Sequence, residues 1–444
     1  MKSIAQVAAR LQGYDPQALS ADGVNAFLAQ LVEPLRETDE VGIFEALGRV
    51  LARDVVSPVS VPPHDNSAMD GYAFDGAQLR DDQPLALEVV GTALAGKAWQ
   101  GTAGTGQCVK IMTGAIMPVG LDTVVPQELT TDRAEPVEAS AGTSTSSART
   151  VVVVPPNLLQ AGDNRRLKGE DLHEGRPALL AGERLLPAAC GLLASLGLET
   201  VTVRRKLRVA YFSTGDEILS LGEAPREGAV YDSNRYTVFG LLTRLGCEVV
   251  DMGVVRDEPA MLEAAFTQGA TQADAIITSG GVSVGEADYT RAMMKKLGDV
   301  EFWRIAMRPG RPMAVGRIPS ADPGRSAGAI LFGLPGNPVA VMVTFLAFVR
   351  PAILRMMGAR PDPLPLLKAS SQEPMRKKPG RTEYQRGIVS RAEDGSLVVR
   401  TTGNQGSGVL RSMVQANGLI VLDHAQGNVA AGDAVDVLMF EGAV

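Results

Sequence analysis

Cysteine and histidine are scarce in this chain of 444 residues, which contains three of each. The three cysteines, Cys108, Cys190 and Cys247, are far apart and form no CxxC pair. The histidines form no HExxH motif and no paired spacing with cysteine. The sequence therefore excludes a disulfide framework and argues against a structural zinc site. This cysteine usage is typical of a reducing cytoplasm.

Long hydrophobic runs and an excess of positive charge are also missing. The longest apolar run covers residues 339–349, and about 20 residues are needed to cross a bilayer core, so we expect a buried helix of a soluble protein there. The first twenty residues carry no pattern typical of a signal peptide. The formal net charge of −7 argues against a protein that coats nucleic acid. An anionic small ligand stays possible if local arginines hold it.

The length predicts two to four domains, because one hydrophobic core rarely extends over so many residues. Apolar residues recur at helical spacing over residues 26–35 and again over 43–51, which predicts helices in both segments. Residues 55–155 alternate short β-rich pieces with glycine turns and predict a small β-rich insertion. Helical texture returns at LPAACGLLASLG, residues 186–197.

Residues 205–357 alternate predicted strands and helices. LRVAYFST, CEVVDMGVVRD and ADAIITSGG predict strands, and NRYTVFGLLTRLG and PAMLEAAFTQGATQ predict the helices between them. This alternation favours an α/β domain with a parallel doubly wound sheet. After a proline-rich linker, residues 363–444 read as a compact β-barrel-like domain.

Acidic residues follow three of the predicted strands in the α/β domain. Asp216 and Glu217 follow the first, Asp257 and Glu258 the second, and Glu286 and Asp288 the third. Acids at one edge are explained by helix capping, whereas acids at three adjacent edges favour a shared site. Several carboxylates around one crevice suit Mg²⁺, which prefers oxygen ligands and substrate phosphates.

Glycine, proline and arginine accompany these acids. Gly280 and Gly281 would let a phosphate or another anion approach the backbone closely. In LPGNP, Asn337 and Pro338 fit a helix start, but that role does not require Pro335.

The arginines of the segment FWRIAMRPGRPMAVG form either a solvent-exposed basic loop or a set of forked donors for an oxyanion. They are Arg304, Arg308 and Arg311.

Nine segments in order resemble the molybdopterin molybdenumtransferase family, the MoeA and gephyrin E-domain proteins, and bacterial MoeA in particular. They are DNSAMDGYA, IMTGA, GEDL, FSTGDEI, YDSN, SGGVSVGEADY, LPGNPVA, PGRTEYQRG and TGNQGS. The resemblance implies an elongated homodimer whose chain has four domains. They are a discontinuous N-terminal linker and dimerisation domain (1–54 and 156–204), a β-rich insertion (55–155), an α/β molybdopterin-binding domain (205–357) and a C-terminal β-barrel domain (363–444).

The resemblance also implies one Mg²⁺-dependent reaction, in which adenylylated molybdopterin and molybdate give molybdenum cofactor and AMP. It assigns metal binding and catalysis to Glu217, Asp257 and Asp288. We expect Asp288 to orient or deprotonate the nucleophile. Further catalytic positions are Asp70, Thr113 and Asp171.

Substrate-binding positions follow from the same resemblance. They are Gly280, Gly281, Ser283, Pro335, Pro338, Arg308, Arg311, Arg386 and Ser407. The sequence departs from the family in carrying RPGRP where relatives often have KPGKP, and Asn404 where some have His. Because the planar fork of arginine differs from the point charge of lysine, the oxyanion role of Arg308 and Arg311 is left open.

Three alternatives stay open from the sequence. A tungstate-inserting homologue would use a near-isosteric oxyanion, and a gephyrin-like scaffold would bind a protein partner without catalysis. A nucleotide hydrolase would need only the α/β domain. The expected protein is a cytoplasmic homodimer that does not bind nucleic acid or membranes and contacts other cofactor-biosynthesis proteins transiently.

Overall fold

The computed structural model describes residues 3–135, 149–282, 289–325, 328–361 and 363–442. By contacts between residues the chain divides into two compact units. The first unit comprises residues 1–53, 181–190 and 200–444, and the second comprises residues 54–180 and 191–199. Each unit is described by itself.

The second unit is a β domain built on one six-stranded sheet in the order β7–β4–β6–β5–β9–β8. These strands are β7 (Thr123–Pro126), β4 (Gly71–Phe74), β6 (Gln107–Ile111), β5 (Leu85–Ala93), β9 (Arg149–Val154) and β8 (Thr131–Glu135). Alternate residues of β4 enter two different cores, because Ala73 packs on one side and Tyr72 and Phe74 pack on the other. Two short pairs, β2 (Val55–Val56) with β11 (Pro177–Leu179) and β3 (Asn66–Ser67) with β10 (Arg165–Arg166), complete the unit.

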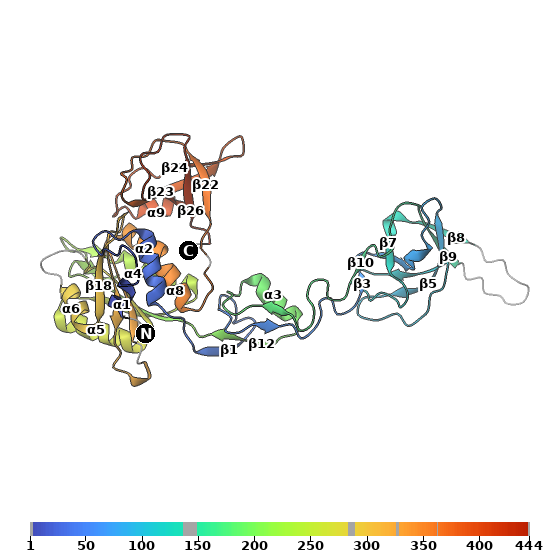
Figure 1. The fold of residues 1–444 in the computed structure, drawn as a ribbon, viewed down its shortest axis with the longest axis horizontal. Helices are drawn as coiled ribbons and strands as arrows, with labels where there is room; N and C mark the ends of the chain where they lie inside the picture. Colours follow the sequence, from blue (N-terminus) through green and yellow to red (C-terminus); the bar gives the residue numbers. More distant parts are fainter. Residues whose placement is uncertain (1–2, 136–148, 283–288, 326–327, 362, 443–444) are drawn as a thin grey trace, which may run out of the picture. The chain divides into compact units, whose positions relative to one another are not determined.

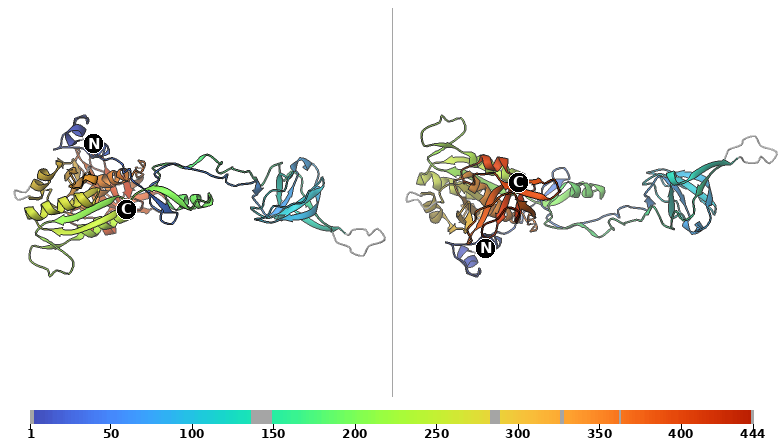
Figure 2. Two further views of the ribbon diagram at one scale, coloured as in Figure 1. Left: turned by 90° about the horizontal axis from the view of Figure 1, so that it is seen from below. Right: turned by 90° about the horizontal axis from the view of Figure 1, so that it is seen from above.

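The centre of the first unit is a six-stranded sheet in the order β16–β13–β17–β21–β20–β18, visible in Figure 1 and in the two views of Figure 2. Its strands are β16 (Glu248–Val255), β13 (Arg208–Thr214), β17 (Ala275–Ser279), β21 (Ala329–Leu334), β20 (Pro312–Ile318) and β18 (Asp299–Arg304). The first four are parallel, which confirms the predicted parallel sheet, and β20 and β18 extend it antiparallel.

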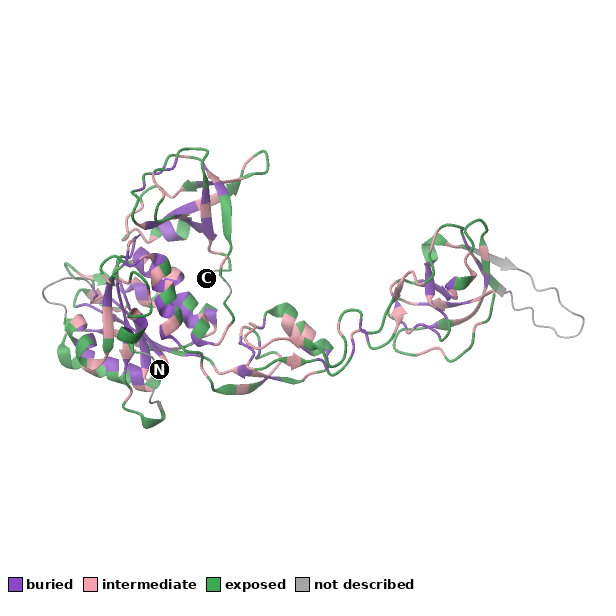
Figure 3. Cartoon of the chain, in the orientation of Figure 1, coloured by how far each residue is buried: buried purple, intermediate pink, exposed green. Residues whose placement is uncertain are grey.

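Helices cover both faces of this sheet, and its central strands β13, β17 and β21 are accordingly buried at nearly every position. In β13, Val209 and Tyr211 enter one core cluster, and Ala210 and Phe212 enter the other. The first cluster packs under α4 (Ser233–Leu245), α7 (Pro338–Thr344) and α8 (Arg350–Met356), and the second packs under α5 (Pro259–Gln272) and α6 (Tyr289–Leu297). Figure 3 shows the sheet buried between these layers. The doubly wound prediction is thereby confirmed.

One continuous helical segment, Pro338–Met356, is long and apolar enough to cross a membrane by length and composition. It joins α7 to α8 through a π-helical stretch, Phe345–Val349, and 72% of its apolar window is buried inside the protein. The segment is therefore a core helix of the α/β sheet, as the sequence predicted for residues 339–349.

The C-terminal part of the first unit is a barrel-like sheet in the order β19–β23–β24–β22–β26–β25, which closes because β25 also pairs with β23. Its strands are β19 (Met307–Arg308), β23 (Thr382–Arg391), β24 (Leu397–Thr401), β22 (Leu366–Ser371), β26 (Ala434–Met439) and β25 (Gly418–Leu422), with the short helix α9 (Arg411–Gln415) beside them. The barrel-like prediction is confirmed. Because β19 belongs to the RPGRP segment, the α/β sheet and the barrel meet at that segment.

The N-terminal segment contains α1 (Ile4–Ala8) and α2 (Ala21–Leu31), and α3 (Pro187–Ser195) follows later in the chain. The prediction of a helix over residues 43–51 is wrong. β1 (Thr38–Gly42) pairs instead with β12 (Thr200–Arg204), and the chain turns after Gly42. Gly48, with φ of +77°, adopts a left-handed conformation that ends any helix. Long-range strand pairing thus overrides the local helical spacing.

Candidate functional site

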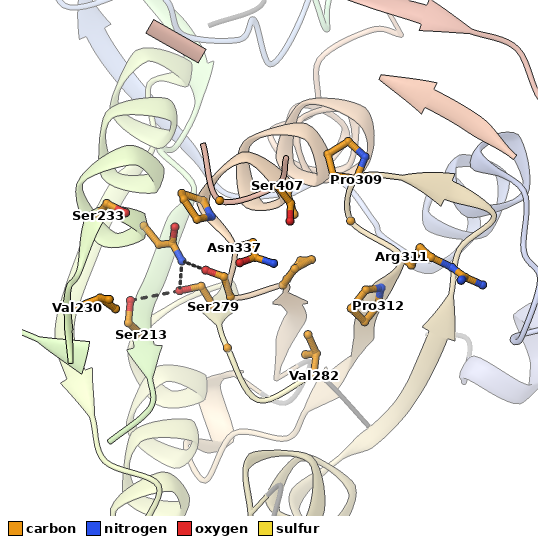
Figure 4. A pocket seen from close by; sticks show the side chains of 18 of the residues that line it. Ser213, Val230, Ser233, Ser279, Val282, Pro309, Arg311, Pro312, Asn337 and Ser407 are labelled. Atoms are coloured by element: carbon orange, nitrogen blue, oxygen red, sulfur yellow. Dashed lines mark hydrogen bonds between the residues drawn. The ribbon is translucent and has the colours of Figure 1, made fainter. Parts of the chain in front are cut away.

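A cavity of about 1060 Å³ lies where the strands of the α/β sheet end. Ser213 and Thr214 from β13, Ser279 from β17 and Pro335 after β21 form its floor. The RPGRP segment and the loop that carries Ser407 form further walls. Figure 4 shows Ser213 and Ser279 on one side and Arg311 and Pro312 on the other. This edge of a parallel sheet is the place where ligands bind in α/β folds, as the sequence predicted.

Glycine is required at the loop that leaves β17. Gly280 and Gly281 have φ of +97° and +62°, which disfavours any side chain. A Cβ on Gly280 would lie 2.5 Å from the carbonyl oxygen of Thr214, and one on Gly281 would lie 2.3 Å from Cβ of Thr290. The N–H of Gly280 already donates to the carbonyl of Leu334 at 3.1 Å. A side chain at either position would therefore clash with Thr214 or Thr290. Because the N–H of Gly280 is already bonded, the role of Gly280 is to avoid this clash and not to donate to a ligand.

The acidic edge is partly assembled in the described structure. Glu217 lines the cavity, and the side chain of Asp257 is half-buried beside it. The hydroxyl of Thr290 donates to Oδ1 of Asp257 at 3.1 Å, and the backbone N–H of Asp257 donates to Oδ1 of Asp216 at 3.3 Å. Burial, and then the negative charges of Asp216 and Glu217, raise the pKa of Asp257 although the Thr290 hydroxyl lowers it.

The positive side of the cavity is formed by Arg308 and Arg311, both of them exposed. In Figure 4 the side chain of Arg311 points away from Ser407 and Asn337. Arg311 also lines a smaller neighbouring cavity of about 350 Å³ together with Arg304. Arg308 and Arg311 are thus exposed and also line the cavity, so the solvent-exposed basic loop and the set of donors for an oxyanion both stay open as interpretations.

Arg386 does not line the cavity. Its side chain is 1% exposed and donates to the carbonyls of Asn404 and Gly406 at 3.2 and 3.0 Å and to the hydroxyl of Ser412 at 3.0 Å. Burial, and then the charge of Arg308, lower its pKa to about 10. Arg386 therefore holds the loop that carries Ser407.

The LPGNP loop is joined to the loop of Ser407. Pro335 and Pro338 line the cavity, and Asn337 is the N-cap of α7 without a side-chain capping bond. The N–H of Val339 donates to the carbonyl of Ser407 at 3.1 Å. This bond fixes the start of the helix against the barrel domain.

Several lining residues carried no role in the sequence prediction. A buried hydroxyl network under the floor joins Tyr211 to Ser213 at 2.9 Å and to Ser279 at 2.7 Å. Asp232 and Asn234 line the cavity from the start of α4. The YDSN segment that contains them was among the segments that carried the resemblance, and this polar run after a strand was the signal available.

Arg381 also lines the cavity, and the sequence prediction gave it no role. It forms an ion pair with Glu383 at 2.6 Å, and Glu383 is 2% exposed. The segment RTEYQRG contains Arg381 and Arg386. Its sequence does not indicate that Arg381 reaches the cavity while Arg386 is buried.

The remaining predicted residues lie elsewhere. Asp70, Thr113 and Asp171 are exposed residues of the second unit, where Oδ1 of Asp70 accepts from the N–H and the hydroxyl of Thr113 at 2.6 and 2.9 Å. These bonds lower the pKa of Asp70. Ser283 and Asp288 lie outside the described residues. Within the part of the chain that is described, no three acidic, histidine or cysteine side chains are grouped so that they could hold a metal ion.

Three protein-family models match successive parts of the chain. Residues 19–197 match the MoeA N-terminal region (domain I and II), residues 210–355 match a probable molybdopterin binding domain, and residues 368–440 match the MoeA C-terminal region (domain IV). The cavity described above lies mainly in the second of these regions.

Curated relatives and a solved structure agree with this result. The molybdopterin molybdenumtransferase of Haemophilus influenzae is 40% identical over 93% of this chain and 96% of its own length. The enzyme of the same name from Bacillus subtilis is 33% identical over 91% of this chain and 90% of its own. A crystal structure of a molybdopterin biosynthesis MoeA protein from Pyrococcus horikosii has a TM-score of 0.69 and 28% identity, covering 96% of this chain and 99% of that one. The chain belongs to the molybdopterin molybdenumtransferase family.

Proposed function

We propose that this protein transfers molybdenum from molybdate to adenylylated molybdopterin and releases AMP. One observation carries the proposal: a single cavity of the molybdopterin-binding region is lined both by Glu217 and by Arg308, Arg311 and Ser407. The proposed substrates are a pterin with a phosphoanhydride-like link to AMP and a tetrahedral dianion. Both substrates are anions, so their binding needs positive charge and hydrogen-bond donors. The reaction also needs a nearby carboxylate that can accept or donate a proton.

The acidic edge supplies carboxylate oxygens, the kind of ligand that Mg²⁺ prefers. Burial disfavours the ionised form of Asp257, and so do the negative charges of Asp216 and Glu217. A hard cation bound among these oxygens would relieve the repulsion between the carboxylates. We propose that Glu217, Asp257 and Asp288 hold the ion. When bound, Mg²⁺ would neutralise charge on the substrate phosphates.

The protein's own groups would perform the remaining steps. The exposed guanidinium groups of Arg308 and Arg311 would bind molybdate by charge-assisted hydrogen bonds, and the Ser407 hydroxyl would add a neutral donor. Gly280 and Gly281 would shape the floor on which the substrate lies, because a side chain at either position would clash with Thr214 or Thr290. Asp288 would orient or deprotonate a water molecule whose oxygen attacks the phosphorus atom, and the phosphoanhydride P–O bond would break so that AMP leaves. The two dithiolene sulfurs would replace two oxygens of molybdate, which take up the thiol protons and leave as hydroxide or water.

We further propose a homodimer with two composite sites. Asp70, Thr113 and Asp171 lie on the second unit, and this unit of one chain would supply them to the cavity of its partner, as a two-fold axis allows. The division into four domains, 1–54 with 156–204, 55–155, 205–357 and 363–444, belongs to the same proposal. So does a cytoplasmic location, which suits three free cysteines.

The test is AMP release from adenylylated molybdopterin by the purified protein, with and without molybdate. We expect release only when molybdate and Mg²⁺ are both present. Release without molybdate would indicate a nucleotide hydrolase, and absence of release under all conditions would indicate a scaffold. Replacing molybdate by tungstate measures the preference between these two oxyanions. Sulfate is the control, because it is a tetrahedral dianion that carries no metal to be inserted.

A further inference from the structure

Two buried oxygen atoms at the start of α4 have no hydrogen-bond donor in the described structure. They are Oδ2 of Asp232 and Oδ1 of Asn234. Asp232 is 4% exposed and Asn234 is 8% exposed, and both residues line the cavity. Buried acceptors are almost always paired in proteins, so two unpaired ones in one cavity wall call for an explanation.

Only one of the two polar atoms in each side chain has a hydrogen-bond partner within the described residues of the protein. Asp232 is the N-cap of α4, and its other oxygen, Oδ1, accepts from the N–H of Arg235 at 3.1 Å. Nδ2 of Asn234 donates to the carbonyl of Gly336 at 2.7 Å and lies 3.4 Å from the hydroxyl of Ser279. These bonds fix the amide orientation, because exchanging its two ends would place Oδ1 against the Gly336 carbonyl. Capping and loop attachment thus leave one acceptor on each residue unused.

The unused pair selects a ligand with N–H donors. A carboxylate and an amide oxygen accept hydrogen bonds but do not attract phosphate or molybdate, and the arginines that suit those anions lie on the RPGRP side of the cavity. The ring end of a pterin carries an exocyclic amino group beside a ring N–H. This edge offers two adjacent donors, and the carboxylate would strengthen one of the bonds by its charge.

We propose that Asp232 and Asn234 bind the amino-pyrimidinone edge of the pterin and thereby set the direction in which the substrate lies in the cavity. This inference rests on the proposed function. The donor-bearing end would meet α4, and the phosphate-bearing end would point toward Arg308 and Arg311. Asp232 supplies the charged acceptor, and Asn234 both accepts from the pterin and ties the LPGNP loop to α4.

The experiment compares the binding of pterin and of pteridin-4-one, which lacks only the 2-amino group, by calorimetry with the full-length protein. We expect wild type to bind pterin at least about tenfold more tightly, since a site built to pair a donor rejects a ligand that lacks it. Asp232→Asn keeps a good N-cap and a similar size. It should weaken pterin binding about ten- to a hundredfold, at about 1.4 kcal/mol for each tenfold change. The preference for pterin should fall below about threefold.

Two further variants separate recognition from folding. Asn234→Ala removes both the acceptor and the tie to Gly336, so a purely structural role would weaken both ligands equally, whereas recognition predicts a smaller ratio between them. Ser233→Ala, at the residue between the two, is the matched control and should keep the wild-type ratio. A wild-type ratio near one, or an unchanged ratio in Asp232→Asn, would overturn the inference while leaving the proposed function intact. A wild-type protein that binds neither ligand would count against both.

Discussion

Replacing Thr290 by valine tests how the acidic edge of the cavity is tuned. Thr290 is 1% exposed, and its hydroxyl donates to Oδ1 of Asp257 at 3.1 Å. Valine has nearly the same shape and lacks the hydroxyl, so Thr290→Val removes this bond and little else. Since burial and the charges of Asp216 and Glu217 already raise the pKa of Asp257, losing the donor should raise that pKa further.

The size of the effect follows from one hydrogen bond. A neutral donor contributes about 0.5–1.5 kcal/mol, and one pKa unit corresponds to about 1.36 kcal/mol, so the pKa of Asp257 should rise by about 0.4–1.1 units. If catalysis needs ionised Asp257, the acid limb of kcat/KM against pH moves to higher pH by the same amount. The Mg²⁺ concentration for half-maximal rate should rise on that limb and stay unchanged well above it.

Stability should depend on pH with a definite sign. Because the folded-state pKa of Asp257 is raised, ionising this group costs the folded state. The cost is absent below the ordinary pKa and present in full above the folded pKa. Thr290→Val should therefore be less stable than wild type at pH 8, by about 0.5–1.5 kcal/mol, and the difference should shrink in acid.

Thr290→Ser is the matched control, because serine keeps the hydroxyl that reaches Asp257. The assay is AMP release measured across pH for wild type and the two variants. If the acid limb of Thr290→Val coincides with that of Thr290→Ser, Asp257 does not govern the acid limb through this bond, and the reasoning is refuted.

The other predictions concern the anion wall, the nucleophile and the dimer. Arg308→Ala or Arg311→Ala should raise the molybdate concentration for half-maximal rate about ten- to a hundredfold with little change in pterin affinity, since each removes a charge-assisted contact of about 1.5–3 kcal/mol. An unchanged molybdate dependence in both would make the RPGRP segment a plain loop. Asp288→Asn should still bind adenylylated pterin but release AMP at least about a hundredfold more slowly, and near-normal turnover would remove Asp288 from the mechanism. Co-expressing differently tagged Asp70→Ala and Asp288→Ala chains should give active mixed dimers from two inactive parents, because one of the two sites regains both acids; inactive mixed dimers would sink the shared-site proposal.

The sequence by itself determined the elements of the α/β sheet. The predicted helix over PAMLEAAFTQGATQ matches α5 (Pro259–Gln272) residue for residue, and the helix predicted to end at Gly246 ends there, with φ of +88° at that glycine. Both signals are local, since a proline that opens a helix and a glycine that closes it act within one turn. The alternation of predicted strands and helices likewise indicated a parallel doubly wound sheet.

Tertiary structure decided what local signals could not. The spacing over residues 43–51 predicted a helix, but β1 pairs with β12, about 160 residues away in sequence, and the chain then forms turns and isolated bridges from Val50 to Arg184 and from Leu51 to Val203. In RTEYQRG the two arginines are alike in sequence. Only the closure of β23 with β24 and β25 buries Arg386 under the Ser407 loop, while Arg381 reaches the cavity.

The same holds for the candidate site. The sequence placed Glu217, the paired glycines and the RPGRP arginines at one edge, because strands of a parallel sheet end together. It gave no role to Asp232 and Asn234, since a polar run before a helix reads first as a cap. Their significance depends on which of their atoms the fold leaves without a partner. The local cap bond from Arg235 takes up one atom of Asp232, and Ser279 and Gly336, which are distant in sequence, take up the amide nitrogen of Asn234.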